Sequence, residues 1–313
     1  MKANDVRNVV VVGAGVMGHS IAQVFAGAGI DVMLVDLDEK VLERAVRLIE
    51  NNLNTLAGMG KVSDDQIPAV LDRIHPSTDL ASAASGVDFA LEAVAEVPAA
   101  KKEIFSGLDE FCPDHAVLAS NTSTLDIFDI VKINKPGRMV ATHWFAPPHI
   151  IPLVEITPGP ATVPEVVTFT EKLMERLGKR PVVMKEFVPS FIVNRIQNNI
   201  LLAVYDILQN GWATPEQIDR AVKLSLGIRL PIVGVVQTMD FTGLDLVHQI
   251  TSNFGLENEI IRERVDKGHL GAKTSKGMYD YGGRSEEEIL RKRDELYIRM
   301  VDHLEAIDAF KPV

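Results

Sequence analysis

A run of valines followed by three spaced glycines constrains the fold of this chain more than any other feature. Residues 9–12 are four consecutive valines, and residues 13–18 read Gly-Ala-Gly-Val-Met-Gly. A run that is apolar on both faces is typical of a strand buried inside a parallel sheet. Gly13 permits a tight turn, Gly15 lets the backbone approach a ligand, and Gly18 lets the next helix pack against the strand. The pattern predicts a strand–turn–helix unit whose helix N-terminus binds a pyrophosphate.

An acidic residue follows the second predicted strand. Residues 32–35 have strand character, and Asp36 comes directly after them. A carboxylate there accepts hydrogen bonds from the ribose hydroxyls of an adenosine and repels a 2′-phosphate, which favours NAD over NADP. We therefore expect NAD as the cofactor. FAD and a plain glycine-rich turn with a solvated aspartate remain as alternatives. The expected cofactor contacts in this region are Gly13, Gly15, Val16, Met17, Gly18 and Asp36.

The charge and cysteine content exclude several classes of protein. The formal net charge is −11, and such a surface repels the phosphates of nucleic acids. A single cysteine, Cys112, rules out a disulfide within the chain and fits a reducing, cytoplasmic location. No apolar run of about 18 residues is present, so we expect no membrane partner.

The pattern of apolar residues changes near residue 186. Up to residue 184, strand-like and helix-like segments alternate, which is typical of an α/β fold with a doubly wound parallel sheet. The predicted strands are residues 9–12, 32–35, 89–93, 116–119, 139–142, 153–156 and 181–184. The predicted helices between them are residues 17–28, 39–56, 99–111 and 164–177. We expect a Rossmann-type NAD-binding domain over residues 1–186.

The remainder of the chain has helical character throughout. The predicted helices are residues 191–209, 215–226, 244–253 and 286–307. Thr214 and Ser285 stand where N-caps are expected, each with a glutamine or glutamate three residues later. We expect an all-helical C-terminal domain over residues 187–313 for substrate binding and dimerisation. The apolar residues of the helix at 191–209 predict a homodimer, because a short domain by itself does not cover that much apolar surface.

One histidine and one glutamate have the spacing of a catalytic pair. His143 follows the predicted strand at residues 139–142 and so lies near its C-terminal end. Open α/β sheets bind their ligands at the C-terminal ends of the strands. Glu155 lies inside an otherwise apolar strand, and a buried carboxylate needs a partner. A dehydrogenase needs a base for the hydroxyl proton of the alcohol, and histidine is the usual choice. We therefore expect His143 as the base and Glu155 as the residue that orients its ring.

Taken together, these motifs resemble those of the L-3-hydroxyacyl-CoA dehydrogenase family. The matching segments are residues 13–18 with Asp36, 92–96 with Lys101, 120–123, His143 with Pro147, 153–155, 191–195 and 271–277 with Lys273. The resemblance implies reversible hydride transfer between NAD and the secondary alcohol of a small-molecule L-3-hydroxyacyl substrate. It implies that Ser123 and Asn194 bind the substrate oxygen. It also implies that Glu96, Lys101, Ser123 and Lys273 contact the cofactor.

Other interpretations of these residues remain open. Ser123 could cap a helix, and Asn194 could be an ordinary polar contact. A second family of β-hydroxyacid dehydrogenases uses a lysine base on the helix where this chain has Asn194-Arg195. A catalytically inert NAD(H)-binding sensor or structural protein is an alternative of another class. The histidines and Cys112 lack metal-ligand spacing, so we expect no metal.

Departures from the family pattern concern the substrate. Ala146 stands where acyl-CoA enzymes of the family usually have asparagine, and Pro152 where they have lysine. The helical segment expected to meet the CoA phosphates retains only Lys61, and several phosphates need cationic partners. These differences favour a free hydroxy acid of the gulonate, carnitine or pyridine-carboxylate type as an alternative to a CoA thioester. Ser190 also replaces the glycine of the family's Pro-Gly-Phe sequence.

Overall fold

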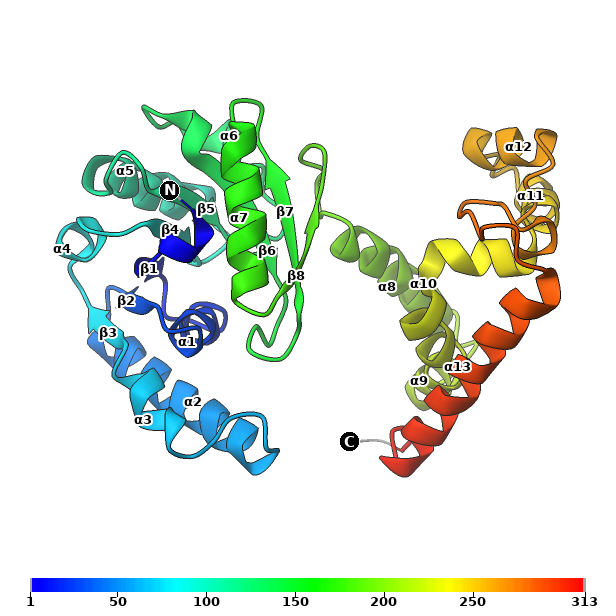
Figure 1. Cartoon of the computed structure of the whole chain (residues 1–313), viewed down its shortest axis with the longest axis horizontal. Coiled ribbons are helices and arrows are strands. Elements are labelled where there is room, and N and C mark those ends of the chain that lie inside the picture. Colours follow the sequence, from blue (N-terminus) through cyan, green and yellow to red (C-terminus); the bar gives the residue numbers. More distant parts are fainter. Residues whose placement is uncertain (1, 312–313) are drawn as a thin grey trace. The chain divides into compact units, whose positions relative to one another are not determined.

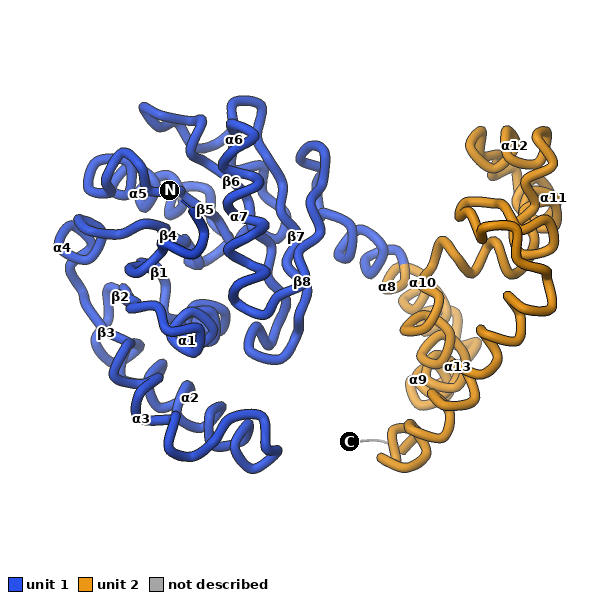
Figure 2. Tube along the Cα trace, viewed as in Figure 1, with its two compact units in different colours: residues 1–199 blue, residues 200–313 orange. Residues whose placement is uncertain are grey.

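The computed structural model describes residues 2–311, which divide into two compact units between Asn199 and Ile200 (Figure 2). The domain boundary predicted after residue 186 lies earlier in the chain and stays a prediction. The predicted fold class, a Rossmann-type domain followed by a helical one, is confirmed.

The first unit is built on one sheet of eight strands (Figure 1). Their order in the sheet is β3-β2-β1-β4-β5-β6-β7-β8. The strands are β1 (Asn8–Val12), β2 (Asp31–Val35), β3 (Ile74–Ser77), β4 (Phe89–Glu92), β5 (Val117–Ser120), β6 (Met139–Trp144), β7 (Leu153–Pro158) and β8 (Arg180–Val183). The strand β3 was not predicted, because it lies at the sheet edge, contains a proline and has only Ile74 fully buried.

The prediction of a parallel sheet is wrong for one pair of strands. β7 runs antiparallel to β6, whereas every other neighbouring pair is parallel. Only residues 145–152 connect these two strands. That segment is too short for a crossover helix, so the chain has to turn back beside the strand it has just left.

Helices cover both faces of the sheet. They are α1 (Gly18–Gly27), α2 (Glu39–Gly58), α3 (Gln66–Leu71), α4 (Leu80–Ala84), α5 (Pro98–Phe111), α6 (Ile127–Ile130) and α7 (Pro164–Arg176). Val9 and Val11 face one apolar core with α1, α2 and α7, whereas Val10 and Val12 face a second core with α4, α5 and α6. The valine run of β1 is therefore buried on both faces, as predicted.

The second unit is helical. α8 (Val193–Gln209) crosses the division between the units, and α9 (Pro215–Leu224), α10 (Leu226–Thr242), α11 (Leu244–Asn253), α12 (Glu259–Asp266) and α13 (Glu286–Ala306) follow. The N-caps predicted at Thr214 and Ser285 are confirmed, each as part of a capping box. α10 and α12 were not predicted. α10 contains Pro231, and Gly234 bends it with a φ of +66°.

Two features of these helices bear on the predictions. The helix predicted from residue 191 begins at Val193, and Phe191 instead belongs to the core of the first unit, where it is 1% exposed. Within residues 2–311, no single helix has both the length and the apolar composition to cross a bilayer, and only the bent pair α9 and α10 meets those criteria together.

Candidate active site

His143 and Glu155 face each other across neighbouring strands. His143 in β6 pairs with Glu155 in β7 in the antiparallel register, which brings Nδ1 of the imidazole to 2.8 Å from Oε2 of the carboxylate. Both side chains are buried, at 3% and 1% exposure. Because a carboxylate accepts hydrogen bonds, Nδ1 carries the proton and Nε2 presents its lone pair.

The second oxygen of Glu155 is held by the start of α8. Oε1 accepts hydrogen bonds from the backbone N–H groups of Ile192 and Val193, both at 3.0 Å. The chain reaches this position through Ser190 and Phe191, which have φ values of +68° and +52°. The first of these explains why a glycine suits the family at this position, since glycine adopts positive φ without steric cost.

Aromatic rings and one amide surround the imidazole of His143. The ring centroids of Phe145 and Phe191 lie 4.5 Å and 4.7 Å from that of His143. Nδ2 of Asn194, in the first turn of α8, lies 3.5 Å from Nε2 of the imidazole. The structure thus brings Asn194 to the same atom that would accept a substrate proton.

Ser123 lies in the segment that follows β5. It does not cap the next helix, because Asp126 is the N-cap of α6. Its backbone N–H donates to Oε1 of Glu96 at 2.8 Å, and its hydroxyl makes no hydrogen bond to any other residue in the range 2–311. The hydroxyl is therefore available to a ligand.

The glycine-rich turn has the geometry of a pyrophosphate site. A Cβ on Gly13, whose φ is +100°, would lie 2.6 Å from the carbonyl oxygen of Ala93, and one on Gly18 would lie 1.6 Å from that of Gly13. At Gly15, by contrast, a Cβ would meet nothing within 4 Å. Gly13 and Gly18 are thus required by close packing, whereas Gly15 leaves open space for a ligand, as the sequence predicts.

Asp36 lies at the edge of a cavity next to this turn. Its Oδ2 accepts a hydrogen bond of 2.8 Å from the backbone N–H of Ala14. The cavity has a volume of about 590 Å³, and its lining includes Gly13, Gly15, Asp36 and the apolar side chain of Ile104. An apolar cavity with a carboxylate at its edge suits an adenosine, so these residues fit NAD.

Glu96 and Lys101 belong to a buried network of charges. Nζ of Lys101 is fully buried and lies 2.7 Å from Oε1 of Glu92 and 3.2 Å from Oε2 of Glu96. Burial by itself raises the pKa of the Glu96 carboxyl, but hydrogen bonds from Thr122 and Thr124 and the Lys101 charge outweigh burial and lower that pKa to about 2. Glu96 stabilises the segment after β5, and Lys101 holds Glu96. The contacts of both residues with the cofactor stay predictions.

Sequence reasoning gave Glu92 no role. This side chain has no exposed surface, and its Oε2 accepts hydrogen bonds from Lys101 and from the hydroxyl of Ser120. The signal was present, since a carboxylate in the apolar run 89–93 needs a partner, just as Glu155 does.

Lys273 lies in the second unit. Its Nζ is 2.7 Å from Oδ2 of Asp245, and its side chain is 35% exposed. The predicted contact between Lys273 and the cofactor stays a prediction. No group of three or more histidine, cysteine, aspartate or glutamate side chains within the described residues is placed to bind a metal ion.

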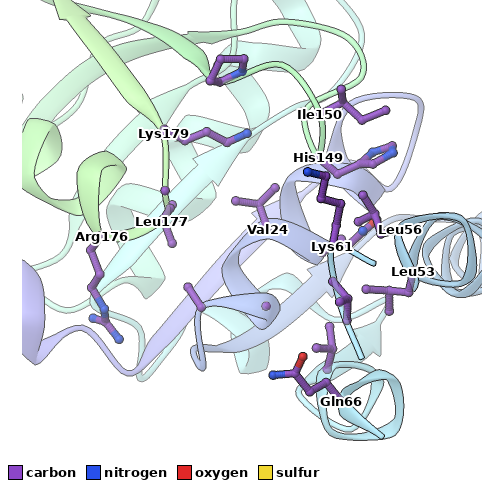
Figure 3. Close-up of a pocket in the computed structure, with 17 residues that line it drawn as sticks. Val24, Leu53, Leu56, Lys61, Gln66, His149, Ile150, Arg176, Leu177 and Lys179 are labelled. Carbon is purple, nitrogen blue, oxygen red and sulfur yellow. The ribbon is translucent and has the colours of Figure 1, made fainter. Parts of the chain in front are cut away.

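A second cavity of the first unit combines several cationic side chains. It has a volume of about 500 Å³ and is lined by α1, α2, α3, the 149–152 segment and the turn between α7 and β8 (Figure 3). Lys61, His149, Arg176 and Lys179 line it, and its lining contains no aspartate or glutamate. Figure 3 shows Lys61 beside His149, with Lys179 reaching in from another side. Lys61 was singled out from the sequence, but its proximity to Arg176 and Lys179 could not be predicted, because those residues come from distant segments.

Comparison with known proteins agrees with this architecture. Residues 8–187 match the NAD-binding domain of 3-hydroxyacyl-CoA dehydrogenase, and residues 191–281 match its C-terminal domain. A probable 3-hydroxybutyryl-CoA dehydrogenase of Bacillus subtilis is 36% identical over 290 residues, which cover 88% of this chain and 98% of the relative. A 5-formyl-3-hydroxy-2-methylpyridine 4-carboxylate 5-dehydrogenase of Mesorhizobium japonicum is 30% identical, with 88% and 91% covered.

A solved structure extends the similarity to three dimensions. The crystal structure of a 3-hydroxyacyl-CoA dehydrogenase from Archaeoglobus fulgidus superposes with a TM-score of 0.80 at 30% identity, covering 96% of this chain and 99% of that one. The two family domains, the NAD-binding turn and this structural match together show that the chain belongs to the 3-hydroxyacyl-CoA dehydrogenase family of NAD-dependent oxidoreductases.

Proposed function

We propose that this enzyme oxidises the secondary alcohol of an L-3-hydroxyacyl substrate, reversibly, with His143 as the general base. The observation that carries the proposal is the 2.8 Å contact between Nδ1 of His143 and Oε2 of Glu155. It leaves Nε2 as the proton acceptor and supplies a negative charge that stabilises the imidazolium formed when the proton arrives. NAD+, when bound, accepts the hydride from the carbinol carbon.

The surrounding residues prepare this proton transfer. Because both oxygens of Glu155 are hydrogen-bonded, the carboxylate cannot rotate away from the imidazole. Phe145 and Phe191 exclude water around the ring. Asn194 and Ser123 would donate hydrogen bonds to the substrate oxygen and so polarise the carbonyl in the reverse direction.

The cofactor would extend from the Gly13–Gly18 turn along the edge of the sheet. Asp36 would accept the ribose hydroxyls, and the backbone at Gly15, Val16 and Met17 would face the pyrophosphate. For the nicotinamide half we propose Glu96 and Lys101, as the family resemblance implies, with the fully buried Lys101 acting through its ion pair with Glu96. We propose Ser123 and Lys273 as further cofactor contacts.

We propose a CoA thioester as the substrate. The relatives named as 3-hydroxybutyryl-CoA and 3-hydroxyacyl-CoA dehydrogenases support this choice. So does the cavity of about 500 Å³, because Lys61 and Arg176 supply positive charges among lining residues that include no aspartate or glutamate, in a chain of net charge −11. Anionic phosphates would be attracted there and repelled elsewhere on the surface.

A free hydroxy acid is the second candidate. The pyridine-carboxylate dehydrogenase from Mesorhizobium japonicum supports it, as do Ala146 and Pro152 at positions where acyl-CoA enzymes usually have asparagine and lysine. The base chemistry of His143 would be the same with either substrate.

One screen separates the two candidates. NAD+ reduction would be followed with 3-hydroxybutyryl-CoA, its N-acetylcysteamine analogue, free 3-hydroxy acids, gulonate and carnitine. For a CoA enzyme we expect kcat/KM to favour the full CoA ester over the truncated thioester by roughly 10- to 100-fold, the range of one or two charge-assisted hydrogen bonds. Lys61→Met should reduce that preference, whereas Lys172→Met, an exposed lysine on α7, should keep it. Equal use of both thioesters, or a higher rate with a free acid, would favour the second candidate.

We further propose that the enzyme is a cytoplasmic homodimer. Large apolar side chains of α8 and of the turn after it are more than a third exposed, and such a surface is typical of an interface. They include Ile196, Ile200, Leu201, Leu202, Tyr205, Leu208 and Trp212. Light scattering at micromolar concentration should give twice the mass of the chain, and a monomer would refute the dimer. Cell fractionation tests the location.

A further inference from the structure

Lys179 is a buried lysine that binds backbone carbonyls. It lies in the turn between α7 and β8 and is 8% exposed. Its Nζ donates hydrogen bonds to the carbonyl oxygen of Pro148 and, at 2.9 Å, to that of Ile151. The same ammonium group lies 5.4 Å from the centroid of the Trp144 ring.

Lys179 has no compensating negative charge within the part of the chain that the structure describes. Among residues 2–311, no carboxylate lies within ion-pair distance of its Nζ, and the charged or titratable side chains that line the same cavity are Lys61, His149 and Arg176. Burial lowers the pKa of Lys179 to about 8. Its positive charge is stabilised by the two carbonyl dipoles and by the face of the Trp144 ring, which offset part of the cost of burying it.

The carbonyls that Lys179 binds belong to the segment that joins the two catalytic strands. Residues 145–152 leave β6 directly after Trp144 and enter β7 at Leu153. The first pair beyond this connection is Trp144 with Val154, and the next is His143 with Glu155. The conformation of the connection therefore sets the register that brings the imidazole to the carboxylate.

The same segment contacts His143 and α1. Phe145 lies against the imidazole ring, with centroids 4.5 Å apart. Nδ1 of His149 lies 2.8 Å from the hydroxyl of Ser20, on the helix that begins at the glycine-rich turn. Lys179 provides the other anchor, because its two hydrogen bonds hold both sides of His149.

We propose that Lys179 is a positioning residue, whose ammonium group fixes the 145–152 connection and thereby the alignment of His143 with Glu155. The inference rests on the proposed role of His143 as the base. Lys179 acts through the connection rather than on the substrate, so its loss should lower the rate of proton transfer and leave cofactor binding unchanged.

The test compares Lys179→Met with the wild type and with Lys172→Met. Lys172 is an exposed lysine on α7, paired with Glu175, and serves as the matched control. With the N-acetylcysteamine thioester, which has no phosphate, we expect Lys179→Met to lower kcat by roughly 10- to 100-fold, the effect of a displacement of about 1 Å at a reacting group. The Kd for NADH should not change. A residue that serves only folding stability would instead leave the kcat of the folded enzyme unchanged when it is replaced, measured well below the midpoint of thermal unfolding.

A small-molecule rescue adds a second variant. Lys179→Ala removes the side chain beside a cavity of about 500 Å³, which has room for an alkylammonium ion. We expect n-propylammonium or n-butylammonium to restore part of the lost kcat, and an uncharged alcohol of the same length to restore none. Equal effects of both additives would contradict a role for the ammonium group.

A spectroscopic measurement keeps the inference testable without turnover. The hydrogen-bonded Nδ1 proton of His143 should give a low-field proton NMR signal, which is assigned by its loss in His143→Gln. We expect Lys179→Met to shift or broaden this signal and Lys172→Met to leave it unchanged. An unchanged signal in Lys179→Met, with unchanged kcat where turnover is seen, would overturn the inference. Absence of turnover in the wild type with all substrates would count against the proposed function only.

Discussion

Nδ1 of His143 and Oε2 of Glu155 lie 2.8 Å apart, in directly paired positions of two antiparallel strands. The spacing of these residues in the sequence follows from that pairing, because residues 145–152 turn the chain back beside β6. A cross-strand pair is held by the backbone ladder as well as by its own hydrogen bond. It is therefore suited to keep one geometry through repeated proton transfers.

This relationship predicts that the two residues act as a unit. His143→Gln should lower kcat by roughly 10²- to 10⁴-fold, the usual contribution of a general base. Glu155→Gln should slow the same step, and the double variant should lose little more than the worse single variant. The measurement is steady-state kinetics of all three, with NADH fluorescence to show that cofactor binding survives. If the double variant loses the product of the two single effects, the residues act independently.

The carboxylate of Asp36 predicts the choice of cofactor. Asp36→Ala should weaken binding of NAD more than of NADP, because it removes an acceptor for the ribose hydroxyls and a charge that repels a 2′-phosphate. Asp38→Ala is the matched control: the Asp38 side chain caps α2 by accepting from the backbone N–H of Lys40 at 2.8 Å, so the ratio of the two Kd values should not change. A wild-type preference for NADP would contradict the assignment.

From the positive φ at Ser190 we predict that glycine at this position stabilises the protein. Ser190 has a φ of +68°, in a region that costs an L-residue roughly 1–2 kcal/mol and glycine nothing. Part of that gain is lost because glycine is more flexible in the unfolded chain. Ser190→Gly should therefore raise the free energy of unfolding by up to about 1 kcal/mol, measured by urea denaturation. Ser85→Gly is the control, since Ser85 has a φ of −68° and glycine there should lower stability.

From the burial of Lys179 we predict how the free energy of unfolding depends on pH. Its pKa is lowered from an ordinary 10.5 to about 8 in the folded protein. Between pH 8 and 10.5 the folded state has lost this proton and the unfolded state keeps it, so the free energy of unfolding rises with pH. Relative to Lys179→Met, the wild type should gain up to about 3 kcal/mol across this window. Urea denaturation of both proteins at several pH values measures the difference, and parallel pH profiles would contradict the lowered pKa.

Features that depend on local geometry could be predicted from the residue pattern. The sequence predicts the first strand and the turn after it, because a buried strand, a positive φ at Gly13 and a close approach at Gly18 each restrict the residue type at one position. Asp36 could be identified from its place directly after the second strand. The N-caps at Thr214 and Ser285 could be predicted because an N-cap also restricts the residue type at one position. His143 and Glu155 could be paired because a buried carboxylate needs a partner.

Contacts between distant segments could not be predicted in this way. Glu155 lies opposite His143 because β7 runs antiparallel to β6. Phe191 was predicted to lie in a helix but packs in the core of the first unit. Lys61, His149 and Lys179 come together from three segments far apart in the chain, and nothing in the sequence around Gly178-Lys179-Arg180 marks a buried lysine. The local backbone conformation restricts which residue types fit at a position, so a residue pattern can reveal it. Contacts between distant segments depend instead on how the whole sheet and its helices pack.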